Sequence, residues 1–263
     1  MNCCICGPAK NCGLYINKVL ENIEKIGNIF DNYIIIIYYD KSDDDTLKLL
    51  KQYKHKNSKL ELFVNRSPIL PFRTHNIAKA RNFIMQRIKQ KYSNFPYFIM
   101  MDLDDRCALD INIDIIKNNL KRTDWDAVSF DHPSEGYYDF WALSIRPYVI
   151  SCHHFHNKLL GLNKIINLIN NSDKDSLIPC WSAFNGFAIY RTEKFIDCYY
   201  DGTFRNDYIP KQLLIENIKF AGPIDQTVQK NEDCEHRHFH FQAILKNNAR
   251  IRISPLQIFN INI

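Results

Sequence analysis

Hydrophobic residues in the first hundred positions alternate between short unbroken runs and stretches with helical spacing. Three runs, at residues 3–8, 33–39 and 97–101, have the length and composition of a strand buried on both faces, as in parallel sheets, and residues 60–64, which include Glu61, form a further predicted strand. The predicted strands are residues 3–8, Tyr33–Tyr39, Leu60–Val64 and Tyr97–Met101. Apolar residues at helical spacing predict helices over residues 14–26, from Thr46 through Tyr53, and over Ile77–Ile88. This alternation predicts an α/β fold with a doubly wound, mostly parallel sheet flanked by helices.

The rhythm changes after Asp105. The pattern there predicts helices over Ile111–Leu120 and Leu159–Ile169, and strands over Ala127–Phe130, Trp181–Tyr190 and Ile251–Pro255. No internal repeat or low-complexity linker interrupts the chain. We therefore expect one domain over residues 1–263, made of two unlike halves, 1–105 and 106–263.

Composition limits the class of protein. The 263 residues are 46% hydrophobic and 13% aromatic, as in globular proteins, and the net charge is only +5. Basic residues are scattered, and no dense basic tract indicates a nucleic-acid partner. No apolar stretch approaches the roughly 20 residues needed to span a bilayer, and the N-terminus lacks the pattern of a signal peptide. We expect a soluble cytoplasmic protein with no membrane anchor and no nucleic-acid partner.

Four of the nine cysteines cluster near the N-terminus, among them Cys3 and Cys6. A Cys-x-x-Cys pair can belong to a zinc site, but no second pair or spaced histidines complete one nearby. We favour reduced cysteines that pack as small apolar residues in the first strand. An odd cysteine count without a signal peptide also favours a reducing compartment.

The candidate chemistry lies at the end of the fourth predicted strand, where the apolar run stops at Asp102-Leu103-Asp104-Asp105. Alternation along an extended segment directs Asp102 and Asp104 to the same side and Leu103 to the core. Carboxylates at a strand end are ligands for a hard divalent cation, which can also hold a diphosphate.

Four segments in this order resemble motifs of the GT-A fold nucleotide-sugar glycosyltransferases of the family 2 type. The segments are Asp40–Thr46, similar to a DDxSxDxT turn; Ala78–Asn82, similar to an ARN helix start; Asp102–Asp104, a DxD; and Glu232–His236, a late acidic motif. The resemblance covers most of the chain. The Ile-, Asn- and Lys-rich composition is also similar to that of soluble transferases from large DNA viruses.

The resemblance implies that residues 1–105 bind a UDP- or GDP-sugar donor and that residues 106–263 supply the catalytic residues and the glycan or protein acceptor site. Asp40 and Asp43 would contact the nucleoside, and Asp102 and Asp104 would bind Mn²⁺ or Mg²⁺ and, through it, the donor. Because Arg pairs with phosphate oxygens, Arg73 and Arg81 are candidate phosphate ligands. A salt bridge to a nearby Asp is the alternative for Arg81.

Residues Glu232–His236 can be aligned with the late acidic motif of the family in more than one register. An inverting transferase needs a carboxylate that accepts the acceptor's proton, and Glu232, Asp233 and Glu235 compete for this role, with Asp233 and Glu235 our candidates. If residues 235–246 are helical, Glu235, His236, Phe239 and His240 share a face. If they are extended, His236, His238 and His240 do, and a three-histidine zinc site is an alternative. In either case His236 and His240 are candidate metal ligands.

Two aromatic segments, Tyr137–Trp141 and Trp181–Phe187, are candidate sugar platforms, although core packing is an equally good reading. Asn185-Gly186 favours a turn with positive φ. The function we expect is metal-dependent glycosyl transfer. A nucleotidyltransferase and a non-catalytic nucleotide- or carbohydrate-binding module are the alternatives, and the first of these would carry a Gly-rich phosphate loop that residues 7–13 match poorly.

Overall fold

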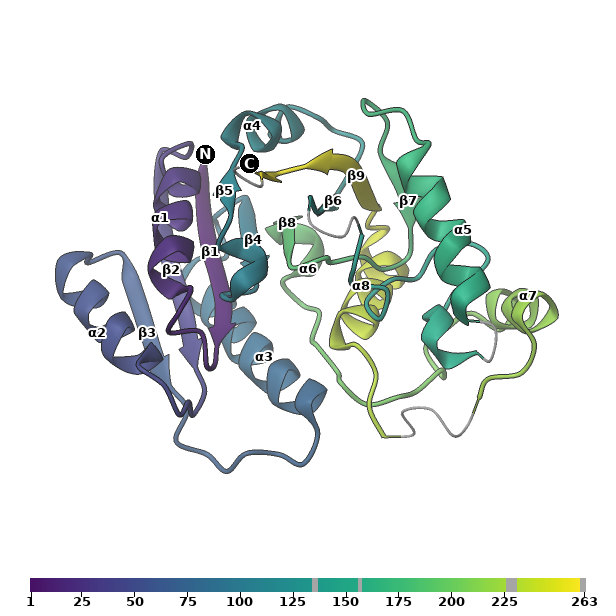
Figure 1. Ribbon diagram of the computed structural model, residues 1–263, viewed down its shortest axis with the longest axis horizontal. Helices are drawn as coiled ribbons and strands as arrows, with labels where there is room; N and C mark the ends of the chain where they lie inside the picture. Colours follow the sequence, from purple (N-terminus) through teal and green to yellow (C-terminus); the bar gives the residue numbers. More distant parts are fainter. Residues whose placement is uncertain (134–136, 156–157, 226–230, 261–263) are drawn as a thin grey trace.

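The structure is a computed structural model that describes residues 1–133, 137–155, 158–225 and 231–260. One eight-stranded sheet, in the order β3-β2-β1-β4-β8-β6-β9-β7, runs through both halves of the chain (Figure 1). Its strands are β1 (Asn2–Ala9), β2 (Asn32–Tyr39), β3 (Leu60–Val64), β4 (Tyr97–Met101), β6 (Ala127–Asp131), β7 (Ile178–Cys180), β8 (Phe187–Arg191) and β9 (Ile251–Gln257). The first four strands are parallel to one another, and β6 is parallel to β9. The predicted fold class, a mostly parallel sheet flanked by helices, is confirmed.

Helices cover both faces of this sheet. They are α1 (Ile16–Gly27), α2 (Thr46–Lys56), α3 (Arg73–Lys91), α4 (Ile113–Leu120), α5 (Lys158–Asn170), α6 (Thr192–Phe195), α7 (Lys211–Ala221) and α8 (Glu235–Asn247). The cluster on one face takes side chains from α1, α2 and α4, and the cluster on the other face takes them from α3, α6 and α8. Short 3₁₀ turns, η1 (Asp105–Cys107) and η2 (Cys152–His154), and a small sheet of β5 (Asp110–Ile111) and β10 (Phe259–Asn260) complete the fold.

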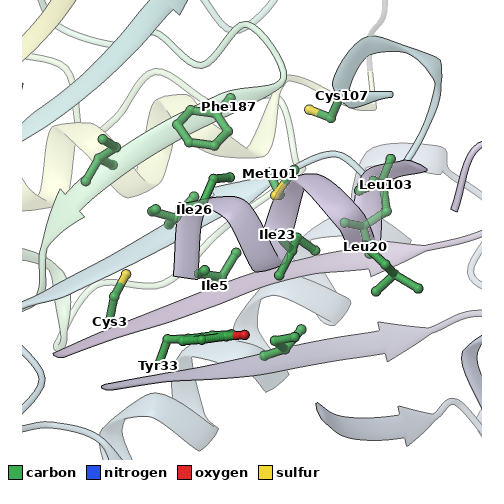
Figure 2. Packing of buried hydrophobic residues seen from close by; sticks show 14 of the residues in the cluster. Cys3, Ile5, Leu20, Ile23, Ile26, Tyr33, Met101, Leu103, Cys107 and Phe187 are labelled. Carbon is green, nitrogen blue, oxygen red and sulfur yellow. The ribbon is translucent and has the colours of Figure 1, made fainter. Parts of the chain in front are cut away.

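Alternation within the buried strands explains why their sequences are apolar throughout. In β1, Cys3 and Ile5 point toward α1, whereas Cys4 and Cys6 pack on the side of α3. Figure 2 shows Cys3 and Ile5 beneath the α1 side chains Ile23 and Ile26. All nine cysteines are free thiols and eight of them are buried. The expectation that the N-terminal cysteines pack as apolar residues in the first strand is confirmed.

Close packing of β1 on β4 depends on a glycine. A Cβ at Gly7 would lie 2.1 Å from the carbonyl oxygen of Met101, the last residue of β4. Real side chains do not tolerate such a contact, so only glycine lets the two strand ends approach where the ligand-binding edge begins. This fixes the position of the Asp102–Asp104 segment relative to β1.

Several predicted boundaries are wrong. Helix α3 begins at Arg73 and not at Ile77, and Ile111 lies in β5, outside α4. The predicted strand Trp181–Tyr190 is a strand only from Phe187, because Asn185 and Gly186 have φ values of 57° and 79°. These positive values confirm the predicted turn.

Helices α6 and α7 of the second half were not predicted from the sequence pattern, and the structure decides one alternative that the pattern left open. Helix α7 packs only part of its surface on the protein, through Leu213 and Leu214, so its apolar spacing is weak. Residues 235–247 are helical, which removes the extended alternative. Within the described residues, no helix has both the length and the apolar character needed to cross a bilayer.

Candidate donor-binding site

A pocket of about 250 Å³ lies at the carboxyl ends of β1, β2 and β4. The chain runs from β1 outward to β2 and β3 and then returns to place β4 on the other side of β1. This reversal is the point where open α/β sheets bind ligands. The pocket is lined by Pro8, Ala9, Lys10, Cys12, Asp40, Arg73, Asn76, Ile77, Ala80, Asp102, Leu103 and Asp104. Three carboxylates and two basic side chains therefore meet around one small volume.

The Asp102-Leu103-Asp104 segment has the predicted geometry. Leu103 is 2% exposed and packs in the core beneath the pocket, while Asp102 and Asp104 line it. The backbone N–H of Asp102 donates to the carbonyl of Gly186 at 2.8 Å, and the Asp104 side chain caps η1 by accepting from Arg106 N. Both carboxylates are thus held at the pocket by backbone contacts.

The electrostatics of this pair favour a cation. Burial raises the pKa of Asp102 to about 7; the nearby Arg81 opposes this shift, and the charges of Asp104 and Asp139 add to it. Burial and the charge of Asp105 also raise the pKa of Asp104. Carboxylates that disfavour one another's charge are stabilised when a cation lies between them. Within the described residues, no group of three or more His, Cys, Asp or Glu side chains forms a metal cage.

The turn after β2 places one of its two predicted ligands in the pocket. Asp40 is 8% exposed and accepts from the side-chain amide of Asn65 at 2.9 Å. Asp43 is exposed, does not line the pocket, and donates its backbone N–H to Asn11. Asp44, not Asp43, ties this turn to the loop that follows β1, since its side chain accepts from the backbone N–H groups of Gly13 and Thr46. The geometry therefore does not fit a nucleoside contact by Asp43.

The two predicted arginines have different surroundings. Arg73 is the first residue of α3, lines the pocket, and makes no hydrogen bond or ion pair with any described residue. Arg81, two turns further along, is 3% exposed and does not line the pocket. Its guanidinium bonds to Asp102 at 2.9 Å and to Glu235. The salt-bridge alternative is therefore the one seen for Arg81, whose Nη1 and Nη2 atoms are taken by Glu235, His236 and Asp102.

Neither predicted catalytic carboxylate fits the role of a free base. Asp233 is 2% exposed, and its oxygens accept from Arg237 Nε at 2.8 Å and Nη2 at 3.2 Å, with His154 Nε2 3.1 Å away. Burial alone would raise the pKa of Asp233, but Arg237 and His154 hold it well below the usual value. Glu235 is buried against Arg81. Pairing makes Asp233 a weak base, and burial with Arg81 keeps Glu235 out of the pocket.

The predicted histidine ligands also lie elsewhere. His240 has both ring nitrogens occupied, Nδ1 by Ser182 at 2.9 Å and Nε2 by Tyr190 at 3.1 Å. His236 contacts Arg81 and stacks on Phe184 with ring centroids 3.8 Å apart. Burial lowers the pKa of both imidazoles, to about 3 for His240. They share a helix face as predicted, but that face packs into the core and does not reach the pocket.

Three residues at the site were missed or given too little weight. Lys10 follows β1 directly and Asn76 lies in the first turn of α3, and both line the pocket. Their only signal in the sequence is a position next to a predicted strand or helix end. Asp139, which the sequence places only within an aromatic segment, influences the pKa of Asp102 and of Glu235.

A switch-point pocket bounded by Asp102 and Asp104 in a mostly parallel sheet agrees with the GT-A fold that the sequence resemblance predicts. Residues 4–197 match the family model described as Glycosyl transferase family 2. The chain belongs to this family, and the predicted enzyme class is confirmed.

Solved structures agree with this assignment at the level of the fold. TarS 1–349 from S. aureus matches with a TM-score of 0.51 and 15% sequence identity, over 98% of this chain and 59% of that one. The same fragment in complex with UDP-GlcNAc matches with a TM-score of 0.51 and 16% identity, over 98% and 57% of the two chains. Its complex with UDP matches with a TM-score of 0.52 and 17% identity, over 100% and 61%. The chain thus spans about three fifths of the TarS fragment. A search of curated protein sequences found no match.

Proposed function

We propose that this chain transfers a sugar from a nucleoside-diphosphate sugar to a hydroxyl group of a glycan or protein acceptor, with Mn²⁺ or Mg²⁺ as cofactor. The proposal rests mainly on the composition of one pocket. Its lining includes three carboxylates and two basic side chains: Asp40, Asp102, Asp104, Arg73 and Lys10. Carboxylates suit a nucleoside hydroxyl and a metal, and unpaired basic side chains suit a diphosphate. The TarS fragment has been solved in complex with UDP and with UDP-GlcNAc, which belong to this donor class.

The residues present fit a divalent metal. Mg²⁺ is usually bound in proteins by one or two carboxylates together with substrate phosphates, so Asp102 and Asp104 are a sufficient protein contribution. When bound, the metal supplies a Lewis acid that neutralises the charge of the departing diphosphate. His236 and His240 do not line the pocket, so the remaining ligands of the metal would come from the donor phosphates and water.

The remaining side chains bind and orient the donor. Asp40 is oriented by Asn65 and lines the pocket, where it would bind the nucleoside. Arg73 is the first residue of α3, where the helix dipole adds to its charge, and Lys10 also lines the pocket. Arg81, which is buried outside the pocket, fixes the Asp102 side chain through a salt bridge. An inverting outcome fits the resemblance, and an origin in a large DNA virus stays a hypothesis from composition.

The test compares two neighbouring carboxylates. Thermal unfolding is measured with UDP, GDP and a panel of their sugars, with and without Mn²⁺. A ligand at about 100 times its Kd stabilises the folded state by about 2.7 kcal/mol, which is about 5 °C for a chain of this length. We expect this shift only when metal and nucleotide are both present. Asp104→Asn should lose the shift, and Asp105→Asn, at an exposed carboxylate outside the pocket, should keep it.

Two results would contradict the proposal. One is a wild-type protein that no nucleotide stabilises in the presence of Mn²⁺ or Mg²⁺. The other is an Asp104→Asn variant that keeps both the metal-dependent shift and sugar transfer. Release of nucleoside diphosphate from a donor sugar distinguishes an enzyme from a module that only binds.

A further inference from the structure

Glycosyl transfer needs a group that accepts the proton of the acceptor hydroxyl, and the late acidic motif does not present one to the pocket. Asp233 is bound by Arg237, and Glu235 is bound by Arg81. Both carboxylates lie within the core, and each has a guanidinium at salt-bridge distance. The third carboxylate of the motif, Glu232, is half-buried, does not line the pocket, and accepts through Oε2 from the backbone N–H and the hydroxyl of Thr74. None of the three lines the donor pocket, so we expect the base to come from another segment.

Asp139 is partly exposed and makes no ion pair with any described residue. Its Oδ1 accepts from the backbone N–H of Ala142 at 3.1 Å, and its second oxygen has no partner among the described residues. One oxygen is thus used to orient the carboxylate and the other is available to a ligand. This is the arrangement that Asp233 and Glu235 lack.

A single turn connects Asp139 to the metal motif. The side-chain oxygen of Asn185 accepts from the backbone N–H of Tyr138 at 2.9 Å and of Asp139 at 3.1 Å. The next residue, Gly186, accepts from the N–H of Asp102 at 2.8 Å. Asn185-Gly186 therefore positions the backbone of Asp102 on one side and that of Asp139 on the other.

The charges support the same placement. The Asp139 carboxylate contributes to the raised pKa of Asp102 and of Glu235, and Arg81 and Arg73 act on Asp139 in turn. Burial is the main cause of the raised pKa of Asp139 itself. A carboxylate with a raised pKa is a better proton acceptor than an ordinary aspartate.

We infer that Asp139 is the catalytic base of this transferase and that the segment Tyr138–Trp141 borders the acceptor hydroxyl. The inference rests on the proposed function. In the step, the acceptor oxygen forms a bond to the anomeric carbon of the donor sugar and its proton passes to Asp139. The bond between that carbon and the diphosphate oxygen breaks, and its electron pair leaves with the nucleoside diphosphate.

The test uses Asp139→Asn, which keeps the oxygen that accepts from Ala142 but cannot take a proton. Asp207→Asn, at an exposed carboxylate on the same half of the chain, is the control. Two quantities are measured for each protein: the Kd of UDP and GDP with Mn²⁺ by calorimetry, and the release of nucleoside diphosphate from UDP- and GDP-sugars. The release assays contain either water alone or a panel of methyl glycosides as acceptors.

We expect Asp139→Asn to lower kcat by about 100-fold or more, since general-base catalysis contributes roughly 10²–10⁴-fold. The Kd of the nucleotide with Mn²⁺ and the melting temperature should stay close to those of the wild type and of the control. Unchanged turnover in Asp139→Asn overturns the assignment. So does a loss of nucleotide binding that parallels the loss of turnover, because Asp139 would then serve the donor site and not the acceptor.

Failure of the proposed function gives a different result. If wild-type protein binds neither nucleotide with Mn²⁺, or binds but releases no nucleoside diphosphate from any donor, transfer itself is refuted and the role of Asp139 with it.

Discussion

Replacing Asp233 by Asn tests whether this carboxylate serves stability and not catalysis. Arg237 is fully buried and donates to both Asp233 oxygens, and also to Ser144 and to the carbonyls of Trp141 and Leu143. An Asn side chain has one oxygen, so its amide NH₂ would face an N–H of the Arg237 guanidinium, and both groups are donors. The buried Arg237 charge would also lose its counter-ion.

The expected loss is large. Removing one partner of a buried ion pair costs about 3–5 kcal/mol. For a chain of this length about 2 °C of melting temperature corresponds to 1 kcal/mol, so we expect a decrease of roughly 6–10 °C at pH 7. Asp207→Asn is a matched control, since Arg205 also binds Asp207 through two nitrogens, but on the surface. Solvent screens the Arg205–Asp207 pair, so we expect the melting temperature of Asp207→Asn to stay close to that of the wild type.

The difference between wild type and Asp233→Asn should depend on pH. Because the pKa of Asp233 is lowered in the folded state, its stabilisation is present above the unfolded-state value of about 3.9. It is lost as the pH falls through the lower folded-state value. Urea unfolding should therefore give a constant difference between about pH 5 and 8 that narrows on further acidification.

One result would refute the reasoning about Asp233. If Asp233→Asn kept the wild-type melting temperature but lost sugar transfer, the carboxylate would be a catalytic group, as the motif resemblance implied, and the base role of Asp139 would be unnecessary.

Two further substitutions test the pocket. Gly186→Ala should lower both stability and metal-dependent nucleotide binding, since φ is +79° and a Cβ would lie 2.3 Å from the Tyr138 hydroxyl. Thermal unfolding with and without UDP and Mn²⁺ measures both effects. A variant with the wild-type melting temperature and the wild-type shift would contradict the positioning role of the turn. Arg73→Ala should weaken UDP or GDP binding about 10- to 150-fold, which corresponds to about 1.5–3 kcal/mol for a hydrogen bond to a charged group. The melting temperature of the free protein should not change, because no described residue pairs with Arg73. Calorimetry in Mn²⁺ measures the affinity, and an unchanged value would mean that the phosphates bind elsewhere.

The fold of the first half follows from local pattern. Runs such as Tyr33–Tyr39 and Tyr97–Met101 are apolar at every position, which only a strand covered on both faces explains. Their strand ends then lie at one edge of a parallel sheet, so the pocket position of Asp40, Asp102 and Asp104 was predictable. The start of the strand predicted over Trp181–Tyr190 was missed although Asn185-Gly186 signals a turn, because the β propensity of the flanking residues was given more weight than the turn.

The roles of the remaining charged residues could not be predicted. Arg81 reaches Glu235, which is 154 positions away in the chain, and Asp139 meets the metal motif only through the turn at Asn185-Gly186. No local spacing encodes these distances.

The sequence by itself determined the order of strands and helices in the first half, the edge of the sheet that carries the carboxylates, and the family. Only the tertiary structure decided which carboxylates are neutralised by a buried arginine and which have no ion-pair partner among the described residues. The physical reason is that a carboxylate's chemistry depends on its burial and its nearest charges, and folding brings these from distant parts of the chain.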